Sequence, residues 1–327
     1  MAESATGTTK PDRATQVAFL GAVLFGGVNA IAIRQTVLEL APLWAMAARF
    51  LTAGLIMAAL AIGLGRRFPS GRSLLGALLY GAVGFAASFG PISVGLRAVP
   101  GATGSVLIAI TPLLTFGLAI AQRQERFHAQ GLLGALIALV GIAIVFADQL
   151  RADIPIGSLA LVVVGAIAIA ESAIILKAVP RSDPFATNAV AMLTGGAVLL
   201  LASFGFGESH VLPAREQTWI ALGYLVVFGS VVLFALFVHV LQRWTASAVS
   251  YATLLFPFVG ITVATVLTGE TFSPSFAIGG AVMLVGVYVG AFQTRPNRTS
   301  ATSAPECLPI DACEGAAPPV AAAGRPA

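Results

Sequence analysis

The stretch PLLTFGLAIAQRQERFHAQGLLGALIALVG at 112–141 decides the fold, because it recurs in altered form as PFVGITVATVLTGETFSPSFAIGGAVMLVG at 257–286. Each copy begins with a proline and has a glutamate 13 positions later, so Pro112 and Glu125 match Pro257 and Glu270 at an offset of 145. This offset is close to half of the 327 residues. A repeat at half the length of an apolar chain indicates a membrane protein built from two related helix bundles.

Composition places the chain in the membrane class. Hydrophobic residues make up 57% of it, charged residues 10%, and the mean hydropathy is +0.93. A soluble chain of this size needs more charge on its surface. The net charge of +4 does not indicate a nucleic-acid partner, because the basic residues are dispersed between apolar runs, where such residues set membrane orientation.

Ten apolar segments are long enough to cross the hydrocarbon core as helices, which takes about 20 residues each. The predicted spans are residues 14–33, 42–64, 73–95, 98–120, 129–147, 156–177, 184–206, 216–240, 245–268 and 274–292. The linkers between them are short, so consecutive helices alternate in direction and pack beside one another. We therefore predict an all-α membrane protein with ten transmembrane helices.

The distribution of lysine and arginine tests this number of spans. Of the 18 basic residues, 13 fall in one alternating set of loops and tails, 4 fall in the other set, and Arg49 lies within a span. By the positive-inside rule the first set is cytoplasmic, which places both termini in the cytoplasm of a multi-pass inner (plasma) membrane protein. A miscounted helix would scramble this asymmetry.

Five helices per half is an odd number, so the second half is predicted to lie upside down relative to the first. The first repeat covers 14–147, an external linker covers 148–155, and the second repeat covers 156–292. An inverted repeat of this kind is typical of alternating-access carriers. The second helices of the halves also agree: Pro42, Leu51, Thr52 and Gly54 recur as Pro184, Leu193, Thr194 and Gly196 at an offset of 142.

The two ends of the chain are polar or rich in Pro, Ala and Ser, and have little to bury. We expect residues 1–13 and the tail 293–327 to be disordered and cytoplasmic. The start is too polar for a cleavable signal peptide. Both cysteines, Cys307 and Cys313, lie in the tail at a spacing that matches no metal motif, and free thiols are expected.

Several segments together resemble one family. They are FGGVNAIAIR at 25–34, AARF at 47–50, LRAVPGATGSVLIAITPLLTFGLA at 96–119 with QRQERF at 122–127, TASAVSYATLLFPFVGITVATVLTGETF at 245–272, and GGAVMLVGVYV at 279–289. Over 14–292 the chain resembles ten-helix members of the drug/metabolite transporter (DMT) superfamily that are built from two EamA domains. The resemblance implies a carrier of small organic solutes, often outward, through a central cavity. Two positions depart from that pattern: Phe25 stands where tryptophan is common, and Glu171 where a small or aromatic residue is usual.

Glu171 is the one carboxylate in the interior of a predicted span, roughly 6 Å below the midpoint of the sixth helix. A carboxylate there is costly unless it is paired, protonated or facing water. One interpretation makes it a proton carrier or a partner for a cationic solute. The other makes it a hydrogen-bonded structural group between helices.

Arg49 is the obvious partner for Glu171, but the depths of the two residues argue against the pair. Their axial separation along the bilayer normal is about 12 Å, at 1.5 Å per helical residue. Arg49 is therefore expected to snorkel toward the outer surface or to bind helix-end carbonyls, with recognition of an anionic solute group as the alternative.

Other polar residues within spans are weaker candidates for the cavity. Asn29 in the first helix either lines it or bonds a neighbouring helix, and pseudo-symmetry matches it to Glu171 and Ser172. His239 near the cytoplasmic end of the eighth helix could exchange protons with Glu171, or is merely interfacial. Tyr251, Tyr224 and Ser88 could supply cavity hydroxyls, although each is also compatible with ordinary packing.

The repeated prolines and glutamates have separate expected roles. Pro112 and Pro257 free a backbone carbonyl in the fourth and ninth helices, so each is a candidate hinge or kink. Glu125 and Glu270 lie at helix ends and are expected to be structural loop carboxylates that accept hydrogen bonds from amides at the start of the following helix.

No hydrolase, nucleotide or metal motif is present, and the three histidines are not at metal-ligand spacing. We therefore predict no enzyme activity, no cofactor and no metal. The predicted function is a gradient-driven transporter, with coupling to protons as one option. Its expected partners are the lipid bilayer and a small organic or amino-acid-like solute, and the resemblance favours efflux. An uptake permease, a membrane-embedded enzyme and a non-transporting receptor or assembly protein are the alternatives.

Overall fold

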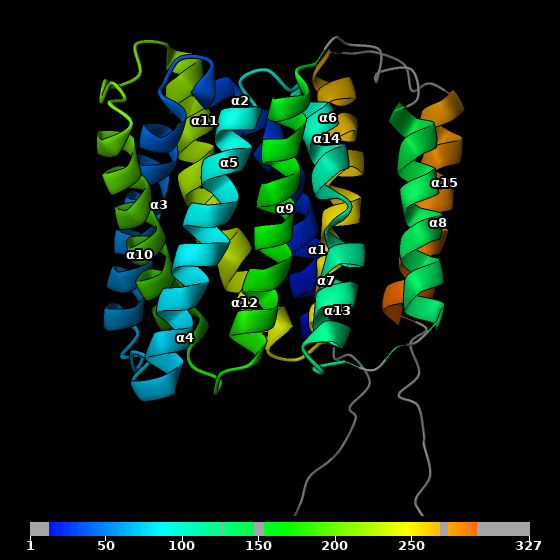
Figure 1. Cartoon of the computed structure of the whole chain (residues 1–327), viewed down its shortest axis with the longest axis horizontal. Coiled ribbons are helices and arrows are strands. Elements are labelled where there is room, and N and C mark those ends of the chain that lie inside the picture. Colours follow the sequence, from blue (N-terminus) through cyan, green and yellow to red (C-terminus); the bar gives the residue numbers. More distant parts are fainter. Residues whose placement is uncertain (1–12, 126, 128, 147–153, 269–273, 293–327) are drawn as a thin grey trace, which may run out of the picture. The chain divides into compact units, whose positions relative to one another are not determined.

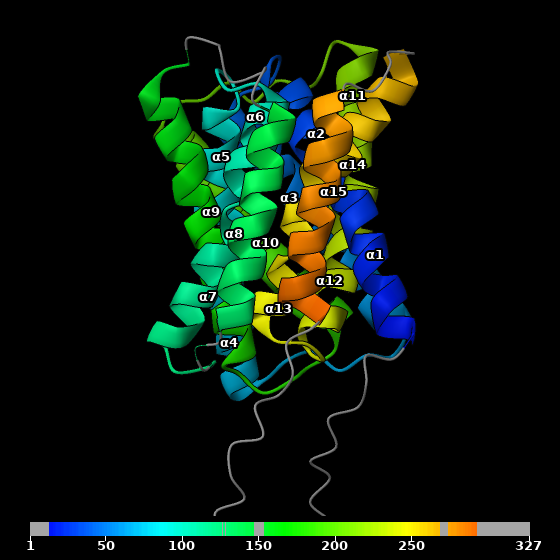
Figure 2. The ribbon, with the colours of Figure 1, turned by 90° about the vertical axis from the view of Figure 1, so that its right-hand side faces the viewer.

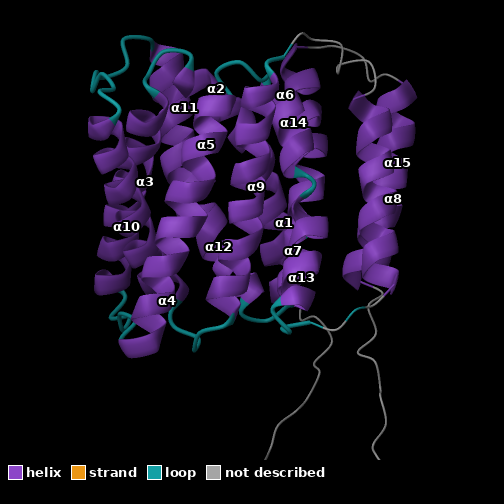
Figure 3. Cartoon of the chain, in the orientation of Figure 1, coloured by secondary structure: helices purple, strands orange, loops and turns teal. Residues whose placement is uncertain are grey.

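The computed structural model describes residues 13–125, 127, 129–146, 154–268 and 274–292. In this part of the chain the regular structure is helical and no strand occurs (Figure 3). Seven helical segments are long and apolar enough to cross a membrane: Arg13–Val37, Pro42–Gly63, Gly71–Gly95, Thr103–Ala121, Ile156–Lys177, Pro184–Gly205 and Glu216–Leu241. Three shorter apolar helices, Ala129–Gly141, Ala246–Gly260 and Ile278–Gly290, correspond to the remaining predicted spans. The all-α membrane fold is confirmed.

Most of the predicted spans of the first half consist of more than one helical piece. The elements are α1 (Arg13–Gly27), α2 (Asn29–Val37), α3 (Pro42–Gly63), α4 (Gly71–Gly81), the π-helix η1 (Ala82–Ala87), α5 (Ser88–Gly95), α6 (Gly101–Ile108), α7 (Thr111–Ala121) and α8 (Ala129–Phe146) (Figure 1). The first predicted span extends four residues further than expected, to Val37, and is interrupted at Val28. Hydropathy alone does not show such interruptions, because a helix pair and one helix have the same composition.

The second half repeats this series with small differences. Its elements are α9 (Ile156–Lys177), α10 (Pro184–Gly205), α11 (Glu216–Val226), the π-helix η2 (Val227–Val232), α12 (Leu233–Leu241), α13 (Ala246–Ser250), α14 (Ala252–Thr268), α15 (Pro274–Val287) and the π-helix η3 (Tyr288–Phe292). η1 and η2 begin 145 positions apart, at the offset of the sequence repeat. Residues 1–12, 147–153 and 293–327 lie outside the described residues, as does Glu270.

Close packing of α3 on α10 shows the two-fold relation between the halves directly. A Cβ atom added at Gly54 would lie 2.9 Å from Leu193 Cγ, and one added at Gly196 would lie 2.9 Å from Leu51 Cγ. The 142-residue offset pairs Gly54 with Gly196 and Leu51 with Leu193. Each half therefore supplies the glycine of one contact and the leucine of the other. The two helices lie side by side at the left of Figure 1.

The same exchange occurs where α8 packs on α15, at the right of Figure 1 and facing the viewer in Figure 2. A Cβ at Gly141 would lie 2.6 Å from the Gly279 carbonyl oxygen, and a Cβ at Gly286 would lie 2.6 Å from the Gly134 carbonyl oxygen. The backbones of the two helices therefore touch, and each contact requires the absence of a side chain.

Carboxylates from distant segments cap several helix N-termini. Glu208, just beyond α10, accepts hydrogen bonds from the amides of Leu43 (3.2 Å) and Trp44 (2.9 Å) at the start of α3. Glu39 accepts from the Thr218 hydroxyl and from the amides of residues 214 and 215 at the start of α11. These bonds, the Thr218 bond foremost, hold the pKa of Glu39 below its ordinary value.

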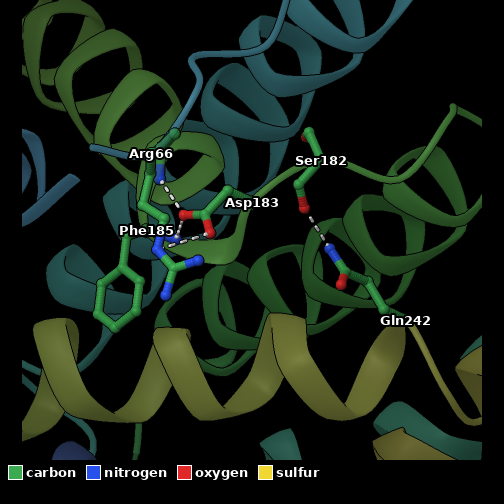
Figure 4. A network of polar contacts seen from close by, with 6 residues as sticks. Arg66, Ser182, Asp183, Phe185 and Gln242 are labelled. Atoms are coloured by element: carbon green, nitrogen blue, oxygen red, sulfur yellow. Dashed lines mark hydrogen bonds and ion pairs between the residues drawn. The ribbon is translucent and has the colours of Figure 1, made fainter. Parts of the chain in front are cut away.

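Asp183 performs the same capping locally for α10. Its Oδ1 accepts from the amides of Phe185 (3.0 Å) and Ala186 (3.2 Å), and its Oδ2 lies 3.6 Å from Nε of Arg66, which follows α3 (Figure 4). The Gln242 side chain donates to the Ser182 carbonyl at 2.6 Å and ties the end of α12 to the same loop. The α3–α10 pair is thus fastened at both ends.

Two basic side chains clamp helix C-termini at opposite ends of the bundle. Arg34 donates to the carbonyls of Leu96 (2.9 Å) and Val99 (2.6 Å) beyond α5. Lys177 donates to the carbonyl of Leu241 (2.7 Å) and to that of Trp244 beyond α12. A cation at a helix C-terminus interacts favourably with the exposed carbonyls and the helix dipole. Each Lys177 contact is the repeat-related counterpart of an Arg34 contact.

The α8–α15 contact generates a stability prediction. Gly286→Ala should lower the melting temperature of the purified protein, because the added methyl meets backbone atoms of α8. The expected overpacking cost is about 1–3 kcal/mol of folding free energy. Gly223→Ala in α11 is the matched control, because an added Cβ there has nothing within 4 Å and alanine favours the helix. Equal melting temperatures for the two variants would contradict the packing described.

Candidate functional site

A cavity is enclosed by helices from both halves. Its walls come from α1, α2, α4, η1, α5 and α6 of the first half and from α9, α12 and α14 of the second. Its volume is about 80 Å³, enough for roughly five to eight water-sized groups at about 10–15 Å³ each. A space of this size suits part or all of a small solute.

The cavity wall is largely apolar, and none of the described residues that form it is charged. Its apolar members are Gly26, Ala30, Ile33, Gly84, Phe89, Ile92, Ile108, Ile169, Leu233, Phe234, Phe237 and Phe256. Its polar members are Asn29, Tyr80, Ser105, Ser172 and Thr253. A few polar groups set in an apolar wall are typical of small-molecule sites, where the polar groups orient the ligand.

Equivalent positions of the two repeats meet in this wall. Gly26 and Asn29 correspond to Ile169 and Ser172 at an offset of 143, whereas Phe89, Ile92 and Ile108 correspond to Phe234, Phe237 and Thr253 at an offset of 145. The cavity therefore lies where the repeats face each other, as expected for carriers built from inverted repeats.

Interruptions of the helices supply part of the wall. Asn29 is the first residue of α2, after the interruption at Val28, and Gly84 lies within η1. Irregular backbone within a membrane is tolerated where it lines a cavity or is buried in protein. Single-turn π-helices are also frequent at functional sites.

The two predicted hinge prolines lie close to helix breaks. α6 ends at Ile108 and α7 begins at Thr111, directly before Pro112, whereas Pro257 lies within α14, six residues after the break at Tyr251. Each proline lacks the amide that would donate to the carbonyl four residues earlier, which belongs to Ile108 or Thr253, both in the cavity wall. Whether these breaks act as hinges stays a prediction.

Arg49 occupies the centre of a buried polar cluster beside the cavity. Its side chain is fully buried, so it does not snorkel to the surface. Nε donates to Ser230 Oγ at 2.8 Å, and Nη2 donates to the Gly229 carbonyl at 2.7 Å and to Asn29 Oδ1 at 3.1 Å. Every one of these partners is neutral. The guanidinium thereby ties α3 to α2 and to η2.

The planar guanidinium also lies near aromatic rings. Its Cζ atom is 4.7 Å from the centre of the Phe50 ring and 5.1 Å from that of Phe89. Phe89 belongs to the cavity wall, so this ring and Asn29 separate the charge from the cavity. Cation–π contacts partly compensate a desolvated charge.

Asn29 faces both the cluster and the cavity. Its Oδ1 accepts from Arg49, while its Nδ2 makes only a long bond of 3.4 Å to the Gly229 carbonyl. A Cβ atom added at position 229 would lie 2.5 Å from Asn29 Oδ1, so a larger residue there would displace the Asn29 amide from its present contacts. Of the seven residues proposed from the sequence for the cavity, Asn29 is the one in its wall.

Glu171 lies apart from both Arg49 and the cavity wall. It is partly exposed, and its two carboxylate oxygens accept from Gln122 Nε2 at 2.9 and 2.7 Å. Gln122 follows α7, so the contact joins α7 to α9. Glu171 precedes the wall residue Ser172, and its role in coupling stays a prediction.

The other proposed residues are fastened to backbone groups or lie near a helix end. Ser88 donates to the Gly84 carbonyl, and Tyr251 donates to the Gly131 carbonyl at 2.6 Å, which ties α8 to the α13–α14 break. His239 in α12 contacts Arg243 through Nδ1 at 3.2 Å. Tyr224 donates to the Phe25 carbonyl at 2.8 Å.

Glu125 has a structural contact with a helix of the second half. Its Oε1 accepts from the Ser247 amide at 3.1 Å, at the start of α13. Its symmetry mate Glu270 lies outside the described residues. The carboxylate thus caps a helix of the other half.

Tyr80 is a wall residue that sequence reasoning missed. Its side chain is 1% exposed, and its hydroxyl has no hydrogen-bond partner among the described residues. Nothing in the neighbouring sequence, LLGALLYGAVGF at 74–85, distinguishes this tyrosine from a packing residue. Ser172, Ser105 and Thr253 were also missed, although the match of Asn29 to Ser172 was a usable signal.

Comparisons with known proteins agree on the class of this chain. The model of the EamA-like transporter family matches it twice, at residues 14–147 and 156–291. The chain is 29% identical over 251 residues to the uncharacterized inner membrane transporter YedA of Escherichia coli strain K12, covering 76% of this chain and 80% of YedA.

Two further relatives have names that state a transported class. A probable terminal-alkyne amino-acid exporter of Streptantibioticus cattleyicolor is 27% identical, over 77% of this chain and 85% of the exporter. A probable amino-acid metabolite efflux pump of Salmonella typhimurium is 23% identical, over 63% of this chain and 72% of the pump.

The Arg49 cluster generates a second prediction. Arg49→Met keeps the length of the side chain but leaves Asn29, Ser230 and the Gly229 carbonyl without their donor. We expect a loss of about 3 kcal/mol of folding stability, measured as a lower melting temperature in detergent. Arg67→Met, at an exposed loop position, is the control and should melt as the wild type does. An unchanged melting temperature for Arg49→Met would show that the cluster does not hold the helices together.

Proposed function

Because the chain belongs to the EamA-like transporter family, we propose that it is a gradient-driven carrier that exports amino-acid-like metabolites across the inner membrane. The observation that carries the proposal is the cavity built from equivalent positions of both repeats. Export and the amino-acid class rest on the names of two relatives, an exporter and an efflux pump.

Alternating access is the mechanism that this arrangement supports. The cavity lies between the two repeats. The Arg34 clamp joins α2 to the turn after α5 in the first repeat, and the Lys177 clamp joins α9 to the end of α12 in the second repeat, at the opposite end of the bundle. Opening one end would require release of the clamp at that end, while the other remains closed. An equilibrium between two such states, shifted by the solute, is sufficient for transport.

The orientation follows from charge. The end that carries Arg66, Arg67, Arg72, Lys177, Arg181 and Arg243 is assigned to the cytoplasm, together with both termini. Lys177 then closes the cytoplasmic end and Arg34 the external end. Export begins with the Lys177 clamp open.

Glu171 is our candidate for proton coupling. Its carboxylate holds Gln122 by two accepted hydrogen bonds, and protonation would replace one acceptor by a donor. The contact between α7 and α9 would weaken as a result. Since Ser172 follows in the cavity wall, a shift of α9 would reach the solute site.

Export itself is tested in cells. The full chain is expressed in a host loaded with dipeptides and a broad metabolite mixture, and the medium is profiled against a vector control. We expect selective release of amino-acid-like compounds, because the cavity admits small solutes with few polar groups. Accumulation inside the cells instead would favour an uptake permease, and an unchanged medium with the protein confirmed in the membrane would favour a non-transporting role.

The coupling assignment has its own test. Glu171→Gln should slow uphill efflux and flatten its dependence on pH, because the amide cannot take up or release a proton. Efflux is measured in proteoliposomes between pH 5.5 and 8.0, with Glu216→Gln, an exposed first-turn residue of α11, as the control. Wild-type rate and pH dependence in Glu171→Gln would leave this residue a structural contact of α7 and α9.

A further inference from the structure

The hydroxyl of Tyr80 is a polar group that the fold leaves unused. It is buried in the cavity wall and lacks a hydrogen-bond partner among the described residues. The ring is held in place by an edge-on contact with Phe85 at 5.3 Å between centres, and by the glycine at position 84. A buried donor without a partner is unfavourable, so its retention next to a cavity indicates a partner that arrives with the solute.

The other hydroxyls of the wall are already committed as donors. Ser105 donates to the Gly101 carbonyl at 3.0 Å, Ser172 to the Ile169 carbonyl at 2.8 Å, and Thr253 to the Ser250 carbonyl at 2.7 Å. Each oxygen keeps lone pairs, so these three groups can only accept from a solute. The remaining donors are the Tyr80 hydroxyl and the Nδ2 group of Asn29, which has one long contact to Gly229.

A positive charge lies directly behind one of these donors. Arg49 bonds Asn29 Oδ1 and otherwise has neutral partners, and no carboxylate of the described residues lies within ion-pair distance of it. Attraction between charges is weakly screened in a buried site of low dielectric. The bond from Arg49 also polarises the Asn29 amide and strengthens Nδ2 as a donor.

We propose that Tyr80 and Asn29 form a subsite for the carboxylate group of the transported solute, with Arg49 as the charge that stabilises it from behind. The proposal rests on the proposed function and names its substrate class. A solute carboxylate would give Tyr80 its missing partner and give the buried guanidinium a counter-charge. A neutral or purely cationic solute with an acceptor oxygen could supply the first gain, but only an anionic group supplies the counter-charge.

The rest of the wall completes the substrate class. Ser105 and Thr253, on α6 and α14, offer acceptors that suit an ammonium group. Between them the wall is apolar and aromatic, with Phe89, Phe234 and Phe256 among its members. This combination matches a zwitterionic amino acid with an apolar side chain, bound with its carboxylate toward Tyr80.

The test compares acids with their amides, because an amide keeps the ammonium group and side chain but loses the anion. Counterflow of L-leucine, L-valine and L-phenylalanine and of their three amides is measured in proteoliposomes that contain the full chain. The wild type should show a half-saturation concentration at least ten-fold lower for the acids. Tyr80→Phe should raise this concentration about five-fold or more for the acids and less for the amides, because the neutral amide carbonyl is a weaker acceptor than the carboxylate.

Two further variants separate a binding role from a structural one. Asn29→Asp keeps the side-chain volume but places an anion at the subsite, so it should abolish acid transport while amide transport persists. Tyr288→Phe makes the same chemical change as Tyr80→Phe at an exposed position and should match the wild type. Without solute, Tyr80→Phe should melt no lower than the wild type, because it removes an unpaired hydroxyl.

The subsite would be overturned if Tyr80→Phe and the wild type had equal half-saturation concentrations for the acids. It would also be overturned if the wild type transported the amides as well as the acids. If another solute is exported by cells but no acid is transported, the subsite is wrong and the carrier function stands. If no solute moves in either assay, the proposed function itself fails.

Discussion

A guanidinium group held inside the membrane domain constrains much of this structure. Arg49 is fully buried, and a charge removed from water is costly unless hydrogen bonds replace its hydration. The replacement comes from Asn29, Gly229 and Ser230, on two helices other than its own. Gly229 and Ser230 present their oxygens from the π-helical turn η2, and Asn29 reaches the cluster directly after the interruption at Val28. Two of the departures from regular helix thus lie at one charge.

The bundle outside this cluster follows the two-fold relation between repeats. Backbone contacts at Gly54 and Gly196, and at Gly141 and Gly286, are exchanged by it, and so are the clamps of Arg34 and Lys177. Exchange is what an inverted repeat implies, because a contact near one end of the bundle has a counterpart near the other end. In apolar surroundings such contacts depend on close packing and on hydrogen bonds, so glycine and basic residues recur at equivalent positions.

The sequence predicted the scaffold far better than the site. Apolar segment lengths and the asymmetry of basic residues indicated the helices, and the offsets of 142 and 145 paired Gly54 with Gly196 and Pro112 with Pro257. The depth argument correctly kept Arg49 apart from Glu171. The partners of Arg49 could not be predicted, because they come from positions 29, 229 and 230, and a π-helical turn leaves no mark in hydropathy. Tyr80 was missed for a related reason: its importance comes from an absent partner, which only a three-dimensional arrangement shows.

The site differs from the scaffold in that its polar groups break the two-fold relation. Repeat offsets place Ala191 opposite Arg49, Ser172 opposite Asn29 and Leu225 opposite Tyr80. All three groups that favour an anion therefore belong to the first repeat. A symmetric wall would bind a zwitterion equally well in two opposed orientations, whereas this wall has one favourable end. Under the proposed function, the symmetric frame would let the cavity open to either side, and the asymmetric lining would keep the solute in one orientation. Arg49, Asn29 and Tyr80 are thus positions at which the two repeats differ in chemistry, although the frame around them is shared.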